Sequence, residues 1–572
     1  MNQEIFIGRN SAILNFSTKY CDTSENLLSS LAFKKVLSKY IYLINTKNTS
    51  IYQFLKKSCE DDISETLVKF FKLLIVLDKS EVSKLNPVYA NLLLNETILF
   101  EFIEGLYSYW RKFERYAIIR NKNTSLGLQN INFIDSMNSF TNLILKTYRL
   151  VEQNILGENH RVYRQLNAGV NAGLILNNAP WKCPKEYSFL EKIPFTESIV
   201  LQPPFITYPR KNTRKGIFCE NRENPIENLT LNLDNWICFP AKVGELLAFV
   251  YFDMNFMAQG VTLCNLFELA KKEEYLNKKP DIIYMYGVKD FHTEMRTEFF
   301  KDLQNDIMIG YVNFNEGIDY FGYMKKMILT LHNLKMIDAG YLPIHGAMVN
   351  LTFKNGLEKN VIIMGDSGAG KSESLEAFRK LSESYIKEMK IIFDDMGVLK
   401  LDENTLTASG TEIGAFIRLD DLDIGYPYKE IDRSIFMNPD KINSRIVIPI
   451  STHSDIIKKY KVDMFLYANN YEDGEVLEFF NSSSIAKPIF IQGARNAKGT
   501  TNEIGKVTSY FANPFGPLQR KNETDILINK YFEKMFEDKI LVGQIRTCLG
   551  IHGLEKEGPE KAAKKLFEFI IK

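Results

Sequence analysis

The segment of the sequence with the clearest chemical meaning is glycine-rich and covers residues 365–372. It matches G-x-x-x-x-G-K-[ST] at every fixed position and consists of Gly365, Asp366, Ser367, Gly368, Ala369, Gly370, Lys371 and Ser372. In such a loop, backbone N–H groups surround nucleotide phosphates at the positive end of the following helix. Lys371 would bridge the outer phosphates, and the Ser372 hydroxyl would ligate Mg²⁺. We therefore expect ATP and a divalent metal ion to bind here.

The residues on either side of this loop support the same expectation. The apolar run at 361–364 predicts a strand that enters the loop, and residues 374–381 predict an amphipathic helix that leaves it. The alternative is a glycine-rich turn with a chance lysine. The order of strand, loop and helix favours a phosphate-binding loop over that alternative.

Two further positions could complete a metal site. The apolar run at 391–393 ends in Asp394 and Asp395, whose side chains would point to alternate faces of a strand. One carboxylate could face a metal ion while the other acts as a base or supports the site, although an acidic turn after a strand is the alternative. His345 lies in an apolar setting, which by itself is more typical of a core residue than of a ligand.

These motifs together resemble two families, phosphoenolpyruvate carboxykinase and HPr kinase/phosphorylase, in which a histidine precedes the phosphate loop and two aspartates follow it. The sequence of the loop itself, notably Asp366 and Glu373, is closer to that of HPr kinase. The carboxykinase pattern extends further and covers about 279–515. The resemblance is therefore closest overall to a divergent, ATP-type carboxykinase.

The carboxykinase resemblance assigns roles to residues that precede the loop. Residues 320–326 resemble the family segment W-Y-G-G-E-M-K-K. It implies that Tyr320 contacts the substrate carboxylate and that Lys326 is a metal ligand beside His345 and Asp395. A lysine ligates a metal only as the neutral amine, and lowering its pKa from about 10.4 to about 7 corresponds to roughly 4–5 kcal/mol.

The resemblance also assigns three arginines and a lid. Arg445 would contact the transferring phosphoryl group, and Arg418 would lie near the nucleotide. Residues 493–500 look like the mobile lid that closes to exclude water. Arg210 lies in a stretch similar to the family's T-G-R-S-P-K and would hold a substrate carboxylate, although a basic surface turn is the alternative.

The chain of 572 residues is long enough for two or three domains. We expect a helical amino-terminal region at 1–155, a carboxykinase-like substrate domain at 156–335, and a nucleotide- and metal-binding domain at 336–572. After Pro280, strands alternate with helices: 281–286 reads as a strand, 321–333 as a helix and 348–353 as a strand. The expected fold class is mixed α/β.

Composition excludes several other classes of function. The 71 basic and 70 acidic residues nearly cancel, so the chain has no overall positive field for nucleic acid. Seven cysteines occur singly, which argues against disulfides and zinc ribbons and favours a reducing compartment. No window resembles a membrane span, so we expect a cytoplasmic protein without a membrane partner.

Three functions fit these observations. The first is a carboxykinase that uses ATP with Mg²⁺ or Mn²⁺ to convert oxaloacetate to phosphoenolpyruvate and carbon dioxide. The alternative is a kinase of a protein serine or of a small hydroxyl compound, with Asp394 or Asp395 as the base. The third is a nucleotide-binding sensor without catalysis, in which residues 1–155 engage a partner.

Overall fold

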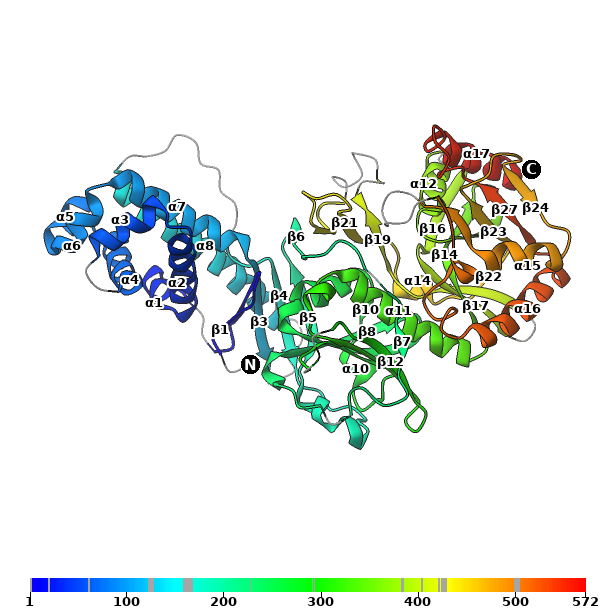
Figure 1. The fold of residues 1–572 in the computed structure, drawn as a ribbon, viewed down its shortest axis with the longest axis horizontal. Helices are drawn as coiled ribbons and strands as arrows, with labels where there is room; N and C mark the ends of the chain where they lie inside the picture. The colour runs from blue at the N-terminus through cyan, green and yellow to red at the C-terminus, as the bar shows by residue number, and fades with distance from the viewer. Residues whose placement is uncertain are drawn as a thin grey trace. The chain divides into compact units, whose positions relative to one another are not determined.

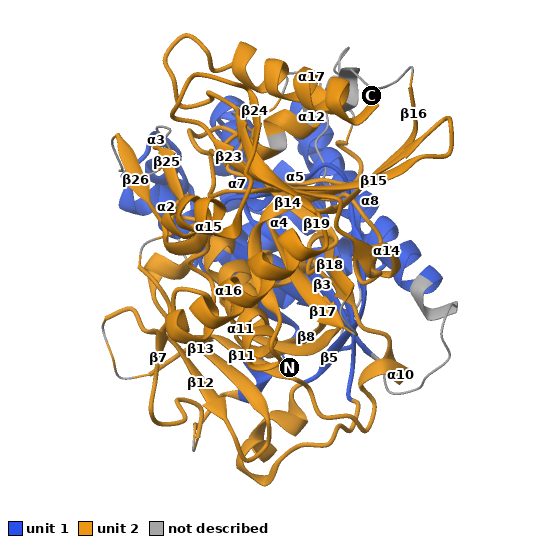
Figure 2. Ribbon diagram, turned by 90° about the vertical axis from the view of Figure 1, so that its right-hand side faces the viewer, with its two compact units in different colours: residues 1–178, 194–208, 233–235 blue, residues 179–193, 209–232, 236–572 orange. Residues whose placement is uncertain are grey.

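The structure of the chain is a computed structural model that describes all residues except 1–2, 19–20, 60–61, 122–127, 158–167, 215, 228, 291, 293, 382–384, 403–404, 420–421, 423–429, 498–504 and 572. It divides into two compact units (Figure 2). Unit 1 comprises residues 1–178, 194–208 and 233–235, and unit 2 comprises 179–193, 209–232 and 236–572. Strands and helices are mixed in both units, which confirms the expected α/β class.

Unit 1 combines a cluster of helices (blue in Figure 1) with a small sheet. Its helices are α1 (Ser24–Ser29), α2 (Leu31–Thr46), α3 (Ser50–Ser58), α4 (Ile63–Leu74), α5 (Lys79–Leu85), α6 (Pro87–Leu93), α7 (Glu96–Lys112) and α8 (Leu128–Leu156). Its strands are β1 (Ile5–Ile7), β2 (Ser11–Asn15), β3 (Glu114–Asn121), β4 (Ala172–Asn177), β5 (Phe195–Leu201) and β6 (Phe205–Thr207). Strands β1 to β5 pair in that order. Helices were expected throughout 1–155, so strands β1, β2 and β3 are a difference from the sequence-based expectation.

The helices of unit 1 form where apolar spacing and capping residues agree. The Ser30 hydroxyl accepts a hydrogen bond from the Phe33 N–H, which satisfies one of the free N–H groups at the start of α2. Leu37, Phe71 and Phe102 are buried where α2, α4 and α7 meet. Among the described residues, no helix combines the length and the apolar character that crossing a membrane requires.

The first sheet of unit 2 has the order β8, β9, β11, β13, β12, β7, with β10 beside β8. These strands are β7 (Cys219–Glu220), β8 (Trp236–Val243), β9 (Leu246–Asp253), β10 (Glu268–Leu269), β11 (Ile282–Val288), β12 (Thr297–Asp302) and β13 (Ile307–Asn313). Strand β11 lies parallel to both of its neighbours and is buried along its length, as is typical of a central strand. The strand expected at 281–286 is confirmed.

The second sheet of unit 2 carries the glycine-rich loop. Its order is β22, β18, β17, β14, β15, β23, β27, β24, and β16 also pairs with β14. The strands are β14 (Leu342–Phe353), β15 (Glu358–Met364), β16 (Ile386–Phe393), β17 (Met396–Asp402), β18 (Thr405–Gly410), β22 (Tyr460–Lys461), β23 (Met464–Asn469), β24 (Leu477–Phe479) and β27 (Leu541–Arg546). Strands β15, β23 and β27 are parallel. The expected strands at 348–353 and 361–364 are therefore confirmed.

A smaller sheet and several helices complete unit 2. Strands β19 (Gly414–Arg418), β21 (Arg445–Pro449) and β20 (Ile435–Met437) pair in that order, and β25 (Ala494–Asn496) pairs with β26 (Lys506–Thr508). The helices are α9 (Met257–Thr262), α10 (Lys272–Tyr275), α11 (Phe321–Asp338), α12 (Lys371–Leu381), α14 (His453–Ile456), α15 (Ser483–Gln492), α16 (Lys521–Glu537) and α17 (Glu557–Ile571). Helices α12 and α17 lie side by side, and the rings of Phe378 and Phe567 pack 5.8 Å apart (Figure 1).

Helix α11 lies between the two larger sheets of unit 2. It packs on β11 and β13 on one side and on β14 on the other. Nearly every residue from Phe321 to Ile337 is buried, including several polar ones. The helix ends at Asp338, and Gly340, two residues further on, has a φ of 79° that lets the chain reverse. Because α11 is enclosed in this way, any polar side chain on it must find its partners inside the protein.

His332 on α11 provides a prediction about stability and pH. It is 2% exposed, and burial lowers its pKa to about 4. The unfolded chain takes up this proton near pH 6.5 whereas the folded chain does not, so stability is lost as the pH falls from 6.5 toward 4. At pH 5 the expected loss is about 2 kcal/mol.

The measurement is urea unfolding of the wild type and of His332→Gln at pH 7 and pH 5. The wild type should lose about 2 kcal/mol more than the variant over this interval. Equal losses in the two proteins would contradict the prediction.

Candidate functional site

The glycine-rich loop follows β15 and leads into α12, as the sequence predicts. Gly368 and Gly370 have φ angles of 80° and 92°, a conformation that favours glycine. A Cβ atom at Gly370 would also lie 2.6 Å from the Thr547 hydroxyl. The Lys371 ammonium group donates to the carbonyl oxygens of Gly365, at 2.7 Å, and Asp366, at 3.0 Å. The lysine is thus held inside the curve of the loop.

Two polar side chains that directly follow the strands β23 and β27 support this loop. The Asn470 amide donates to the Gly368 carbonyl at 2.9 Å, and the Thr547 hydroxyl donates to the Ala369 carbonyl at 2.7 Å. In a planar trans peptide, the N–H group points away from the preceding carbonyl, so the Gly370 N–H points away from Thr547. This orientation suits a loop that offers N–H groups to an anion.

Backbone hydrogen bonds place His345 and Asp395 beside the loop. The Gly365 N–H donates to the His345 carbonyl, and the Gly346 N–H donates to the Asp395 carbonyl, both at 3.0 Å. Gly346 itself is closely packed, since a Cβ there would lie 2.8 Å from the Ile363 carbonyl oxygen. Strand β14 therefore connects the loop to the turn that follows β16.

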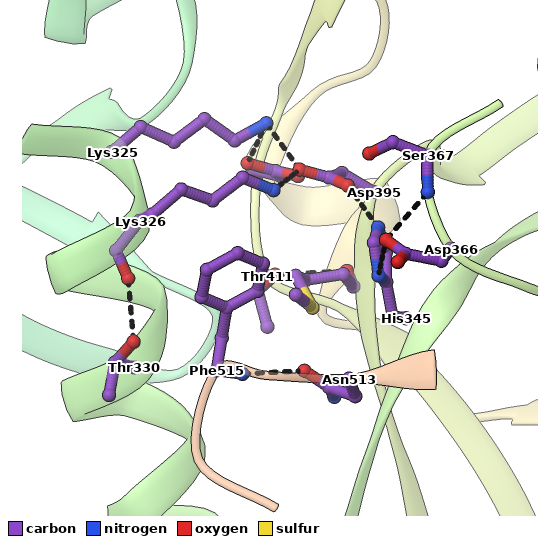
Figure 3. A network of polar contacts seen from close by, with 12 residues as sticks. Lys325, Lys326, Thr330, His345, Asp366, Ser367, Asp395, Thr411, Asn513 and Phe515 are labelled. Carbon is purple, nitrogen blue, oxygen red and sulfur yellow. Dashed lines mark hydrogen bonds and ion pairs between the residues drawn. The ribbon is translucent and has the colours of Figure 1, made fainter. Parts of the chain in front are cut away.

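The side chains of α11 approach Asp395 from the opposite side (Figure 3). The Lys325 ammonium lies 2.7 Å from Oδ2 of Asp395, and the Lys326 ammonium forms an ion pair with the same oxygen. Nε2 of His345 lies 2.8 Å from the other oxygen, Oδ1. The structure thus brings together Lys326, His345 and Asp395, which the sequence analysis had grouped as metal ligands.

The charges in this cluster perturb one another strongly. Burial opposes the ionisation of Asp395, but Lys325, Lys326 and His345 hold its pKa well below the usual range. Burial lowers the pKa of Lys326 to about 8, against the attraction of Asp395. Burial also lowers the pKa of Lys371, although Asp395 and Asp366 act to raise it. Lys326 is consequently much closer to its neutral amine form at physiological pH than an exposed lysine.

A strained piece of backbone fixes the orientation of His345. Nδ1 of His345 donates to the Ala512 carbonyl at 2.7 Å. Phe511 and Ala512 are both buried, with φ angles of 50° and 46°, which are unfavourable for residues other than glycine. Asn333 on α11 stabilises the same segment, because its amide donates to the Phe515 carbonyl at 2.6 Å.

This orientation leaves Nε2 of His345 as a lone-pair acceptor that faces a carboxylate. Two acceptors 2.8 Å apart require a proton or a cation between them, and burial lowers the pKa of His345, which disfavours the extra proton. Among the described residues, no group of three or more His, Cys, Asp or Glu side chains is placed to share a metal ion. A divalent metal at His345 and Asp395 would therefore need Lys326 as its third protein ligand, and these donors fit that role.

Two aromatic rings border the cluster. The Phe515 ring has the Lys326 ammonium 4.5 Å from its centre, and the Phe416 ring has the Lys325 ammonium at 5.6 Å and the Arg445 guanidinium at 5.5 Å. Tyr320 packs against Phe416 with ring centres 6.0 Å apart. These rings keep the cations close together in an apolar setting, where their attraction for an anion is strengthened.

Arg445 and Arg418 are directly opposite one another on the antiparallel strands β21 and β19. Like charges at opposed positions are unfavourable without an intervening anion. Nε of Arg445 is buried and has no hydrogen-bond partner among the described residues. The buried Nε of Arg445 is thus suited to donating to an anionic group.

The structure gives Arg210 and Arg214 different surroundings. The Arg210 guanidinium pairs with Glu316, and its Nε lies 3.7 Å from Asp319. The Arg214 guanidinium instead lies over the Phe218 and Phe515 rings, at 5.1 and 5.3 Å. Within the described part of the chain, no carboxylate is at ion-pair distance from Arg214.

Arg214 also interacts electrostatically with Tyr323 and Tyr320. Burial lowers the pKa of Arg214, and the phenol groups of Tyr323 and Tyr320 act in the opposite direction. Arg214 shares the Phe515 ring with Lys326. Sequence reasoning missed this arginine, although it lies only four residues beyond Arg210.

The remaining residues expected at the site are described only in part. The Ser372 side chain and residues 498–500 of the expected lid lie outside the described residues, although the Ser372 backbone belongs to α12. Ser367 donates its N–H to Oδ1 of Asp366 at 2.7 Å, and Arg495 pairs with the same carboxylate. Asp394 is half-buried next to Asp395.

Comparison with known proteins gives no assignment for this chain. Its sequence matches no protein-family model, and it has no significant match among curated proteins.

Proposed function

We propose that this chain is an ATP- and divalent-metal-dependent phosphoryl-transfer enzyme of the phosphoenolpyruvate carboxykinase type. In this reaction the carbon–carbon bond to the departing carboxylate of oxaloacetate breaks and carbon dioxide leaves. The resulting enolate oxygen attacks the γ-phosphorus of ATP, which gives phosphoenolpyruvate and ADP. The observation that carries the proposal is the backbone link between the loop and the cluster of Lys326, His345 and Asp395.

The electrostatics of Asp395 support this reaction over a hydroxyl kinase that uses Asp395 as its base. A general base works best when its pKa lies near the operating pH. Lys325, Lys326 and His345 hold the pKa of Asp395 far below that range, despite burial, so it is a weak base. The carboxykinase reaction removes no proton from its acceptor, so it needs no such base.

The other residues have roles that follow from their charges. A divalent ion bound by Lys326, His345 and Asp395 would stabilise negative charge on the enolate oxygen. Lys371 neutralises the outer phosphates, and Arg445 neutralises the equatorial oxygens of the transferring group. On the nucleotide side, the Ser372 hydroxyl would be a further metal ligand.

We propose that Arg214, together with Tyr320, binds the substrate carboxylate, rather than Arg210. Arg210 already has Glu316 and Asp319 as partners, whereas Arg214 faces the cluster across Phe515. A guanidinium group can hold a carboxylate with two parallel hydrogen bonds. Because Phe515 also contacts Lys326, a carboxylate held by Arg214 would lie beside the proposed metal ligands.

A pair of arginine variants tests that assignment. Arg214→Ala should raise the KM for oxaloacetate about 10- to 100-fold, the loss expected for charged hydrogen bonds, and should leave the KM for ATP unchanged. Arg210→Ala is the matched control and should change either KM by less than about threefold. The opposite pattern would return the role to Arg210.

The experiment that tests the function is an assay with purified protein, ATP, Mg²⁺ and Mn²⁺ that follows phosphoenolpyruvate formed from oxaloacetate. Lys326→Ala and Lys371→Ala run beside the wild type. Product that disappears in both variants supports the carboxykinase. ATP consumption that requires serine, other hydroxyl compounds or cell extract would instead favour a kinase in which Asp394 is the base, and ATP binding without turnover would favour a sensor.

A further inference from the structure

Glu412 is a buried carboxylate that the proposed reaction does not use. It lies between β18 and β19 and is 1% exposed. Among the described residues, neither of its carboxylate oxygens has a hydrogen-bond partner within normal geometry. The Lys325 ammonium forms an ion pair with it, 3.3 Å from Oε2. A carboxyl group so deeply buried and with so few polar partners is costly to the folded state, which indicates a purpose other than stability.

Lys325 connects Glu412 to the proposed metal ligands. Its ammonium is 1% exposed and lies 2.7 Å from Oδ2 of Asp395, closer than it lies to Glu412. The same oxygen pairs with Lys326, and the other oxygen faces His345. Both oxygens of the Asp395 carboxylate therefore already have partners, with two ammonium groups on Oδ2 and His345 on Oδ1. For Oδ2 to bind a divalent cation, one of its two ammonium partners must move away.

Lys325 is the partner that must move. Lys326 and His345 would become ligands themselves and would stay in place, whereas an ammonium 2.7 Å from a metal-bound carboxylate would repel the cation. Lys325 cannot turn to water, because it is enclosed with α11. Glu412 has unused acceptor capacity at 3.3 Å, within reach of a small side-chain rotation.

We propose, on the basis of the proposed function, that Glu412 is a positioning residue for the metal site: it takes over the Lys325 ammonium when Asp395 binds a divalent cation. Lys325 then alternates between two carboxylates, Asp395 in the metal-free protein and Glu412 in the metal-bound protein. The pair formed with Glu412 is neutral overall, so the bound cation has no buried positive charge beside it without compensation.

The test is the affinity for Mn²⁺, measured without nucleotide by the electron paramagnetic resonance signal of the free ion. The proteins are the wild type, Glu412→Gln, and the double variant Lys325→Met/Glu412→Gln. Glu412→Gln should weaken Mn²⁺ binding about 10- to 100-fold, as is typical for partners that support metal ligands. The affinity of the double variant for Mn²⁺ should recover to within about threefold of the wild-type value, because the ammonium group that Glu412 would bind is also removed.

The double variant also guards against misfolding, since it removes both buried charges together. An unchanged affinity in Glu412→Gln, or a double variant as weak as the single one, would show that Glu412 has no such role. His345→Ala separates this inference from the proposed function. If His345→Ala weakens Mn²⁺ binding but Glu412→Gln does not, only the role of Glu412 fails. If His345→Ala has no effect, the metal site and the inference fail together.

Discussion

Replacing Lys371 with alanine is expected to reduce phosphoryl transfer by about 10³-fold or more. The ammonium group of Lys371 lies inside the loop, where it can stabilise the negative charge of the outer phosphates. Arg495, another cation beside the loop, is already paired with Asp366. The loss should appear in kcat as well as in the affinity for ATP.

The same replacement should have little effect on folding. Burial lowers the pKa of Lys371, so its charge is retained at a cost to the folded state. We expect the free energy of unfolding to change by less than about 1 kcal/mol. Lys387→Ala on β16 is a matched control, because that lysine is exposed and remote from the loop in sequence, and it should leave both properties unchanged. Substantial turnover by Lys371→Ala would rule out the glycine-rich loop as the phosphate site.

Asp395→Asn is expected to have the second large effect, on stability as well as on activity. Asp395 is the shared counter-charge of two buried ammonium groups, those of Lys325 and Lys326. Removing one partner of a buried ion pair typically costs about 3–5 kcal/mol, because the remaining charge stays in an apolar setting. Mn²⁺ binding and turnover should be lost as well, since a neutral amide is a poor metal ligand in this site.

Urea unfolding of Asp395→Asn, measured beside Asp402→Asn, checks this prediction. Asp402 pairs with Lys459 at the surface, and such pairs contribute about 0–1 kcal/mol. The double variant Lys326→Met/Asp395→Asn should recover part of the lost stability, because it removes one of the uncompensated charges. If Asp395→Asn and Asp402→Asn cost the same, the cluster is not the buried charge network described above.

The parts of the site that the sequence could predict are those with fixed local spacing. Lys371 and Asp395 could be located because each follows an apolar strand at a short, regular distance, and Lys326 because it belongs to a continuous segment. The strand, loop and helix around residues 361–381 also follow from periodicity alone. The structure confirms these elements without revealing what the loop binds.

The parts that the sequence could not predict come from segments far apart in the chain. Glu412 and Ala512 meet the cluster through Lys325 and His345, and neither lies in a motif. The strained φ of Ala512 has no sequence signal, because alanine is not typical of that conformation. Strand β3 was missed for a different reason, since charged residues at both ends reduce its apolar signal.

Thr547, which supports the loop, is synthesised long after the loop itself. Chains are synthesised and begin to fold from the amino terminus. A growing chain that has just passed Ser372 contains the whole loop, but it lacks Asn470 and Thr547, which hold the loop carbonyls. The proposed nucleotide site should therefore form only when translation is nearly complete. A chain that terminates before β27 would carry the motif without the Thr547 side chain, which helps to hold the loop in shape.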